Sequence, residues 1–220
     1  MTSTHGKAKR KNSQNYILKF IIQRDKSQDL KQHLRLALKM RVLILSPHTD
    51  DAELGAGGYI SRLIREDKHS ILWVVFSTCE ESLPKTAPKN MLKKEFLSVL
   101  KDLELRNSKV FGYRVRNLPA KRQEILEHLV KINREFKPNL VIGPSTKDWH
   151  QDHQVIANEM IRAFKTSASI IGYEAPWNHL EFETKMFVRL EEEDIQQKVQ
   201  MMNHYKSQLD QNRQYFSEEY

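Results

Sequence analysis

The sequence has a single cysteine and no long apolar run, and each absence excludes a class of protein. Cys79 is the only cysteine among 220 residues, so the chain cannot form an intramolecular disulfide. Its apolar runs are short, such as "ILWVVF", whereas roughly 20 apolar residues are needed to span a bilayer. No signal-peptide core followed by small residues occurs near the N-terminus either. These features predict a cytoplasmic protein.

Basic charge is concentrated at the N-terminus. Residues 1–41 carry 11 basic and 2 acidic residues, a net charge of +9, whereas the remaining 25 basic and 26 acidic residues carry −1. We therefore expect residues 1–40 to be a basic, partly helical extension and expect no specific nucleic-acid partner for the body. A solvated arm is the simplest interpretation. Its second half could also form an amphipathic helix that covers the domain, pairs subunits into a homo-oligomer, or lies on an anionic membrane surface.

Short apolar runs alternate with longer amphipathic stretches from residue 41 onward. They predict strands at 41–46, 70–78, 109–114, 138–145 and 168–174, and an edge strand at 184–190. Helices are predicted at 53–67, 90–105, 120–136, 153–165 and about 191–210. Alternating strands and helices imply crossover connections, and hence a mostly parallel sheet with helices on both faces. Residues 41–220 should form one Rossmann-like α/β domain, because no repeat or low-complexity linker interrupts them.

Two polar motifs each follow a predicted strand. "PHTDDAE" follows the first strand and "DWHQDH" follows strand 138–145, so both should lie at the carboxyl edge of the sheet, where such folds bind ligands. Alone, the first is more often a helix cap, and a lone "HxxH" at a helix start usually has no function. The occurrence of both motifs at the same edge of one predicted sheet is less easily explained by coincidence. Together they supply His48, Asp50, Asp51, Asp148, His150, Asp152 and His153.

These side chains suit a zinc ion or another divalent transition metal. A catalytic zinc keeps three protein ligands and an open position for water, and two histidines with one aspartate supply that number. The remaining carboxylates could act as a general base and as hydrogen-bond partners that fix the tautomer of each histidine. The residues alone leave open which carboxylate takes which role.

"PHTDDAELGAGG" and "DWHQDH", in that order, resemble the signatures of the PIG-L/LmbE-like zinc-dependent N-deacetylases. The resemblance runs from about residue 41 almost to the end, through "KKEFLSVLKDLEL", "YEAPW" and "KVQMMNHYKSQ". The extension before residue 41 has no counterpart in the family's common core. The resemblance implies removal of the N-acetyl group from an N-acetylated amino sugar or sugar conjugate, such as a derivative of N-acetylglucosamine.

Carried over position by position, the resemblance implies a role for each residue of the two motifs. The zinc ligands would be His48, Asp51 and His153. Asp50 would be the general base, His150, in its protonated form, would polarise the substrate carbonyl, and Asp152 would bond to a ligand.

The sequence departs from the family pattern in three places, and the second departure leaves the substrate undetermined. Thr49 replaces a usual proline, "GYRVRN" (112–117) replaces a stretch that helps line the substrate site, and an arginine often found before Glu95 is missing. An amidase for another small amide or a thiol-sugar conjugate therefore stays open. A protein that binds nucleic acid or membrane surfaces through its basic arm is the alternative from a different class.

Other residues have structural interpretations at least as good as functional ones. "GAGG" (55–58) should let a helix pack closely on the sheet rather than bind phosphate. Cys79 should be a structural residue rather than a nucleophile. The run "EEED" (191–194) should form the first turn of the last helix. Four side chains could equally line a sugar-binding mouth or pack in the core: Trp149, Tyr173, Trp177 and His179.

Overall fold

A five-stranded parallel sheet forms the centre of the computed structural model, which describes residues 39–67, 69–181, 183–211 and 213–216. The strands, in the order β3-β2-β1-β4-β5 across the sheet, are β1 (Arg41–Ser46), β2 (Ser70–Val75), β3 (Ser108–Val110), β4 (Leu140–Pro144) and β5 (Ser169–Tyr173). The predicted N-terminal extension, apart from Lys39 and Met40, lies outside the described residues. The α/β fold expected from the sequence is confirmed.

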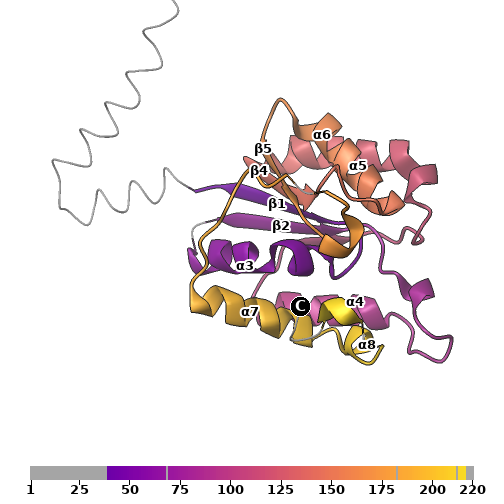
Figure 1. The fold of residues 1–220 in the computed structure, drawn as a ribbon. Coiled ribbons are helices and arrows are strands. Elements are labelled where there is room, and N and C mark those ends of the chain that lie inside the picture. The colour runs from indigo at the N-terminus through magenta and orange to yellow at the C-terminus, as the bar shows by residue number, and fades with distance from the viewer. Residues whose placement is uncertain (1–38, 68, 182, 212, 217–220) are drawn as a thin grey trace, which may run out of the picture. The chain divides into compact units, whose positions relative to one another are not determined.

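Helices cover both faces of the sheet, as Figure 1 shows. One layer holds α3 (Asp51–Arg65), α4 (Met91–Asp102), α7 (Glu192–Asn203) and the short α8 (Lys206–Leu209), and the other holds α5 (Arg122–Phe136) and α6 (Gln151–Phe164). Alternate residues of β1 enter the two cores, because successive side chains of a strand point to opposite faces. Within the described residues, no helix is both long and apolar enough to cross a membrane.

Four short 3₁₀ turns complete the described elements, at Glu80–Ser82, Leu118–Lys121, Pro176–Asn178 and Gln214–Phe216. The first turn follows β2, the second precedes α5, the third follows β5, and the fourth follows α8. Three of these turns contribute residues to the pocket described below: Ser82, Trp177 with Asn178, and Tyr215.

Gly55 in α3 allows this helix to approach the sheet closely. A Cβ atom at Gly55 would lie 2.8 Å from the backbone oxygen of Glu174 and would clash with the ring of Tyr173, which is buried. The close packing predicted for "GAGG" is thereby confirmed at this position. Gly57 and Gly58 instead face Lys198 and Leu190.

We expect Gly55→Ala to destabilise the protein. Overpacking against a backbone atom costs about 1–3 kcal/mol, which exceeds the ~1 kcal/mol that alanine gains over glycine inside a helix. Denaturant unfolding would measure the loss. Gly112→Ala is the matched control, because a Cβ atom there meets nothing within 4 Å. Equal stability of both variants and the wild type would contradict this account of the packing.

Residues 184–190 were predicted to form an edge strand, and this prediction is wrong. The segment has no strand pairing and runs along α3, where the Arg62 side chain donates to the Arg189 carbonyl at 2.8 Å and Leu190 packs over Gly58. Its backbone is therefore partly satisfied by a helix side chain, and Phe187 stays 87% exposed. The short apolar run "MFV" belongs here to a segment outside the sheet.

The last helix begins as predicted but is interrupted. Glu191 and Asp194 form a capping box at the start of α7, which confirms the acidic first turn. The helix ends at Asn203 and α8 resumes at Lys206. At the break, the buried Tyr205 points its hydroxyl inward, 2.6 Å from the Thr49 carbonyl. This contact between the C-terminal region and the loop after β1 explains why the helix does not continue.

The strand order places a switch point between β1 and β4. From β1 the chain proceeds outward to β2 and β3 on one side, then crosses to β4 and β5 on the other. Loops that leave adjacent strands in opposite directions open a crevice at their carboxyl ends, where α/β folds bind ligands. The loops after β1 and β4 carry the two polar motifs.

Candidate metal centre

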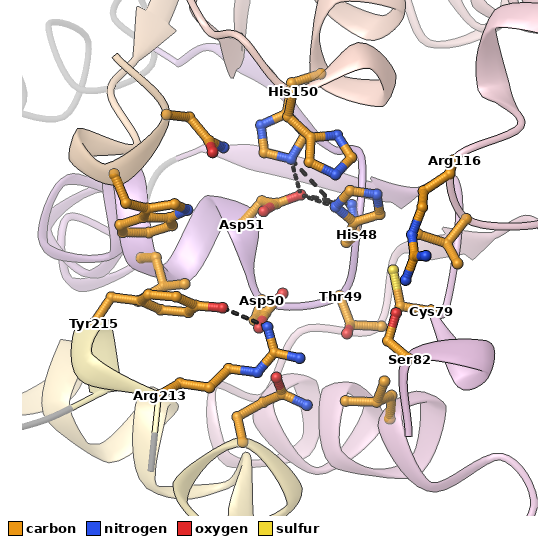
Figure 2. Close-up of a pocket in the computed structure, with 17 residues that line it drawn as sticks. His48, Thr49, Asp50, Asp51, Cys79, Ser82, Arg116, His150, Arg213 and Tyr215 are labelled. Atoms are coloured by element: carbon orange, nitrogen blue, oxygen red, sulfur yellow. Dashed lines mark hydrogen bonds and ion pairs between the residues drawn. The ribbon is translucent and has the colours of Figure 1, made fainter. Parts of the chain in front are cut away.

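The two loops bring the predicted site residues together at this crevice (Figure 2). His48 follows β1 and Asp51 opens α3, while His150 caps the N-terminus of α6 and His153 lies in its first turn. A pocket of about 330 Å³ opens there. Among the predicted site residues its lining includes His48, Asp50, Asp51, His150 and His153, and the buried Asp148 and Asp152 lie behind them.

Three ligand atoms form a nearly equilateral triangle. Asp51 Oδ2 lies 3.1 Å from His48 Nδ1 and 3.1 Å from His153 Nε2, and these two nitrogens are 3.2 Å apart. Two atoms that each bind a tetrahedral zinc at 2.0–2.1 Å are about 3.3 Å apart. The triangle therefore has the size that a zinc ion requires, and its nitrogen and oxygen donors suit zinc.

The hydrogen bonds behind the triangle show that it needs a cation. His48 Nε2 lies 3.1 Å from Asp152 Oδ2, and His153 Nδ1 lies 2.7 Å from Asp148 Oδ2. Because these carboxylates accept hydrogen bonds, the ring proton lies on Nε2 of His48 and on Nδ1 of His153. The other ring nitrogens, His48 Nδ1 and His153 Nε2, therefore direct their lone pairs toward Asp51. Three electron-pair donors in contact repel unless a proton or metal ion lies among them. A carboxylate behind each histidine also fixes its orientation.

Without a metal, the pKa values indicate that protons fill this place. Burial lowers the pKa of His153, but Asp51 and the hydrogen bond to Asp148 outweigh it and raise the pKa to about 9. Burial likewise opposes protonation of His48, yet Asp51 and its other partners hold its pKa well above the usual value. Burial alone would raise the pKa of Asp51, but His153 and His48 hold this pKa well below the usual range.

Metal affinity should therefore depend steeply on pH. A metal ion that binds here must displace the protons of His48 and His153, so the logarithm of its apparent affinity should rise by about one to two units per pH unit up to about pH 9, where His153 titrates. As the pH falls, protons occupy the site and affinity is lost. Competition with a chelator between pH 6 and 9 measures this slope, and a flat profile would contradict the assignment.

Asp50 lies next to the triangle but outside it. It is the N-cap residue of α3, yet its side chain makes no capping hydrogen bond, so the helix-cap interpretation does not hold for this carboxylate. Burial, followed by repulsion from Asp51, raises its pKa to about 6, although His48 and Arg213 oppose the shift. A carboxylate with this pKa is ionised at neutral pH and close to the value that suits a general base.

His150 is held as a neutral imidazole, contrary to the protonated form expected from the sequence. Burial and the charges of His153 and His48 lower its pKa to about 4, and a metal cation would act in the same direction. Its Nδ1 accepts from the Asp152 backbone N–H at 3.2 Å, so the neutral ring carries its proton on Nε2. That N–H is available as a donor. One nitrogen from each of His48, His150 and His153 lies within 4.8 Å of the others, so His150 could also approach a metal.

Asp152 connects the loop after β1 with the segment after β3. Its Oδ2 accepts from the Arg116 backbone N–H at 2.6 Å as well as facing His48, and its Oδ1 accepts from the Leu118 N–H at 3.2 Å. It is fully buried and outside the pocket lining. This arrangement gives Asp152 an orienting role, tying the segment 112–117 to His48.

Several functional neighbours were not predicted from sequence. Gln208, Arg213 and Tyr215 come from the C-terminal region to line the pocket, and Tyr205 holds the loop carbonyl of Thr49 while also contacting Glu53 at 2.6 Å. The family resemblance in "KVQMMNHYKSQ" marked the region, but no pattern in it assigned a side chain to the site.

Aromatic residues divide between the two predicted roles. Trp177 lines the pocket, whereas Tyr173 is buried and donates to the Leu45 carbonyl at 3.1 Å. Trp149 is 67% exposed and, like His179, does not line the pocket. Cys79 is half-buried at the pocket wall, and burial raises the pKa of its thiol, which disfavours the nucleophilic thiolate.

Residues 43–164 match the family described as GlcNAc-PI de-N-acetylase, also called PIG-L. The match covers more than half of the chain and includes both histidine-bearing loops. The chain belongs to the PIG-L family. A curated relative, the uncharacterised deacetylase YaiS of Escherichia coli, is 24% identical over 170 residues, covering 76% of this chain and 90% of YaiS.

Solved structures share the PIG-L fold. The N,N'-diacetylchitobiose deacetylase of Pyrococcus horikoshii has a TM-score of 0.63 at 20% identity, covering 94% of this chain and 82% of that one. GalB of Pseudomonas putida, a 4-carboxy-2-hydroxymuconate hydratase, has a TM-score of 0.61 at 18% identity, covering 80% and 83%. At these identities the likeness is evidence of the fold, and the second structure shows that the fold also occurs in a protein named for a different reaction.

Proposed function

We propose that this protein is a zinc-dependent hydrolase that removes the acetyl group from an N-acetylated amino sugar or sugar conjugate. The observation that carries the proposal is the triangle of Asp51, His48 and His153, which needs a cation, beside a carboxylate that lies off it. Membership of the PIG-L family and the deacetylases among the similar proteins support the reaction class. We assign His48, Asp51 and His153 as the ligands.

The chain's own residues would carry the proton transfers. A bound zinc ion supplies polarisation of a carbonyl and lowers the pKa of water. Asp50 accepts the proton of the attacking water and later returns it to the departing amine, so one carboxylate is base and then acid. His150 donates its Nε2–H to the oxyanion that forms on the acetyl carbonyl, a contribution of about 3–4 kcal/mol per donor in comparable sites. Asp148 and Asp152 hold the two histidine ligands in orientation.

A combined measurement of metal content and product tests the proposal. The protein is purified, its metals are measured by elemental analysis, and amine release is followed over N-acetylglucosamine and its nucleotide-linked and lipid-linked conjugates. About one zinc per chain with release of amine and acetate is the expected result. A zinc-loaded protein that is inert on this panel but cleaves another small amide or a thiol-sugar conjugate would shift the substrate and keep the chemistry. Water addition to an unsaturated acid, as the name of GalB suggests, would overturn it.

We further propose that residues 41–220 carry the activity and residues 1–40 are an appended extension. Residues Met40–Tyr220 form one compact unit, which supports this division. A truncated protein starting near residue 39 should keep its zinc and its turnover. If truncation abolished the protein's only measurable activity and that activity were binding to nucleic acid or vesicles, the arm-centred function would replace the proposed one.

A further inference from the structure

Two arginines face the pocket without a carboxylate partner. Arg116, from the segment after β3, and Arg213, from the C-terminal region, both line the pocket that holds the candidate metal centre, as Figure 2 shows. Across the part of the chain that the structure describes, no carboxylate oxygen lies within 4.0 Å of either guanidinium, and this includes the neighbouring Asp50. Neither guanidinium forms an ion pair within this distance, although the charge of Arg213 lowers the pKa of the nearby Asp50.

Arg213 is held in place by neutral groups. Its guanidinium donates to the Tyr215 hydroxyl at 2.6 Å and to the Gln211 side-chain oxygen at 3.4 Å. Tyr215 in turn stacks on Trp177, with ring centroids 4.3 Å apart and planes inclined by 16°. The arginine is thus oriented over the pocket before any ligand arrives, which lowers the entropy lost on binding. Figure 2 shows it reaching toward Asp50.

Arg116 is fixed through its backbone. Its N–H donates to Asp152 at 2.6 Å, and its left-handed conformation, with φ of 63°, turns the chain at the pocket wall. Arg114, two residues earlier in the same segment, is different: it lies 3.6 Å from Glu81 and does not line this pocket. One arginine of the loop is therefore neutralised by the protein, and the other faces the site.

The charge balance of the pocket favours an anion. Asp50 and Asp51 are the acidic residues of its lining, and they balance the two arginines. A divalent cation bound at Asp51 would offset the charges of Asp50 and Asp51, while Asp148 and Asp152 lie behind the histidines, outside the lining. The two arginines would then be the remaining charged groups of the lining, and exposed positive charge in a concave site attracts anionic ligands. Guanidinium groups suit phosphate and carboxylate, because they donate two parallel hydrogen bonds.

We propose that Arg116 and Arg213 bind an anionic substituent of the substrate, a phosphate or a carboxylate on the acylated sugar. This inference rests on the proposed function, because it takes the pocket to receive a sugar. It adds a selection rule: sugars that carry such a group are preferred over neutral ones. If Arg213 served only to balance Asp50, its loss would affect neutral and anionic ligands alike.

Binding of deacetylated sugars to the zinc-loaded protein tests the rule without turnover. Calorimetry would compare glucosamine with its 1-phosphate and 6-phosphate and with muramic acid, which carries a carboxylate. We expect at least one anionic sugar to bind tenfold or more tightly than glucosamine, and which one it is distinguishes phosphate from carboxylate. Arg213→Gln and Arg116→Gln should each weaken binding of the preferred anionic sugar about tenfold or more and leave binding of glucosamine nearly unchanged. Arg213→Lys should retain part of it, and Arg114→Gln, the matched control, should leave it unchanged.

The outcomes separate this inference from the proposed function. Equal binding of all four sugars, or a preference that neither glutamine variant reduces, would overturn the anion site, and the second result would assign the preference to the metal alone. Arginine-dependent preference in a protein that deacetylates nothing would support the anion site and overturn the proposed function. Rates on N-acetylglucosamine and its phosphates complete the comparison, since a true specificity site should raise kcat/KM for the preferred anion. Circular dichroism of each variant ensures that lost binding reflects lost charge.

Discussion

Asp50→Asn should retain zinc and lose most of its turnover. Asparagine keeps the shape of the side chain but cannot accept a proton from water, and general-base catalysis contributes about 10²–10⁴-fold to a rate. The side chain lies outside the triangle formed by Asp51, His48 and His153, so metal content should stay near that of the wild type. Elemental analysis and kcat/KM on one preparation measure both quantities.

The pH profile of the wild-type protein provides the control for this variant. Burial raises the pKa of Asp50 to about 6, and a bound cation would lower it again. With the metal site kept saturated at every pH, kcat/KM should fall as the pH drops through a value at or below 6, because the base acts only when ionised. The residual activity of Asp50→Asn should lack this acid limb. Loss of zinc from Asp50→Asn together with activity would instead make Asp50 a ligand.

The fold was largely predictable because its strands are buried on both faces. The runs "VLIL" and "LVI" of the two central strands are apolar throughout, as central parallel strands are, and the amphipathic stretches between the strands leave few other arrangements. The prediction for residues 184–190 was wrong because a short apolar run such as "MFV" can also occur in a segment that packs beside a helix and pairs with no strand. No glycine or proline marks the break in the last helix. The contact that accompanies the break joins Tyr205 to Thr49, which is distant in sequence.

The meeting of the two polar motifs was also predictable, but the hydrogen-bond partners of the histidines were not. His48 and His153 follow adjacent strands, so the fold rule alone brings them together. The partner of each histidine could not be read off in the same way. Asp148 and Asp152 flank His150 in one short motif, and only the structure shows that one faces His153 and the other crosses to His48. Arg213 reaches the pocket because of the path that the C-terminal region takes, and no sequence motif around Arg213 predicts this position.

The same substitution one position later should have the opposite primary effect, because Asp51→Asn should abolish tight zinc binding. Asparagine can still accept from the His48 backbone N–H, which donates to Asp51 at 2.7 Å, so the loop should keep its conformation. The negative charge beside His48 and His153 is lost, however, and with it the electrostatic attraction that favours a cation at this place. Zinc affinity should fall by more than about 100-fold, since even residues behind the ligands are worth 10–100-fold.

Thermal unfolding makes this prediction independent of any substrate. Zinc that binds only the folded protein raises the melting temperature, so the wild type should gain stability on titration and Asp51→Asn should gain little. Asp50→Asn is the matched control and should respond as the wild type does. If Asp51→Asn instead kept the full response, Asp51 would not be a ligand, and the third place would pass to His150, whose ring nitrogen lies within 4.8 Å of the other two. In that case His150→Ala should remove the response, so these adjacent aspartates and one histidine decide between the two ligand sets.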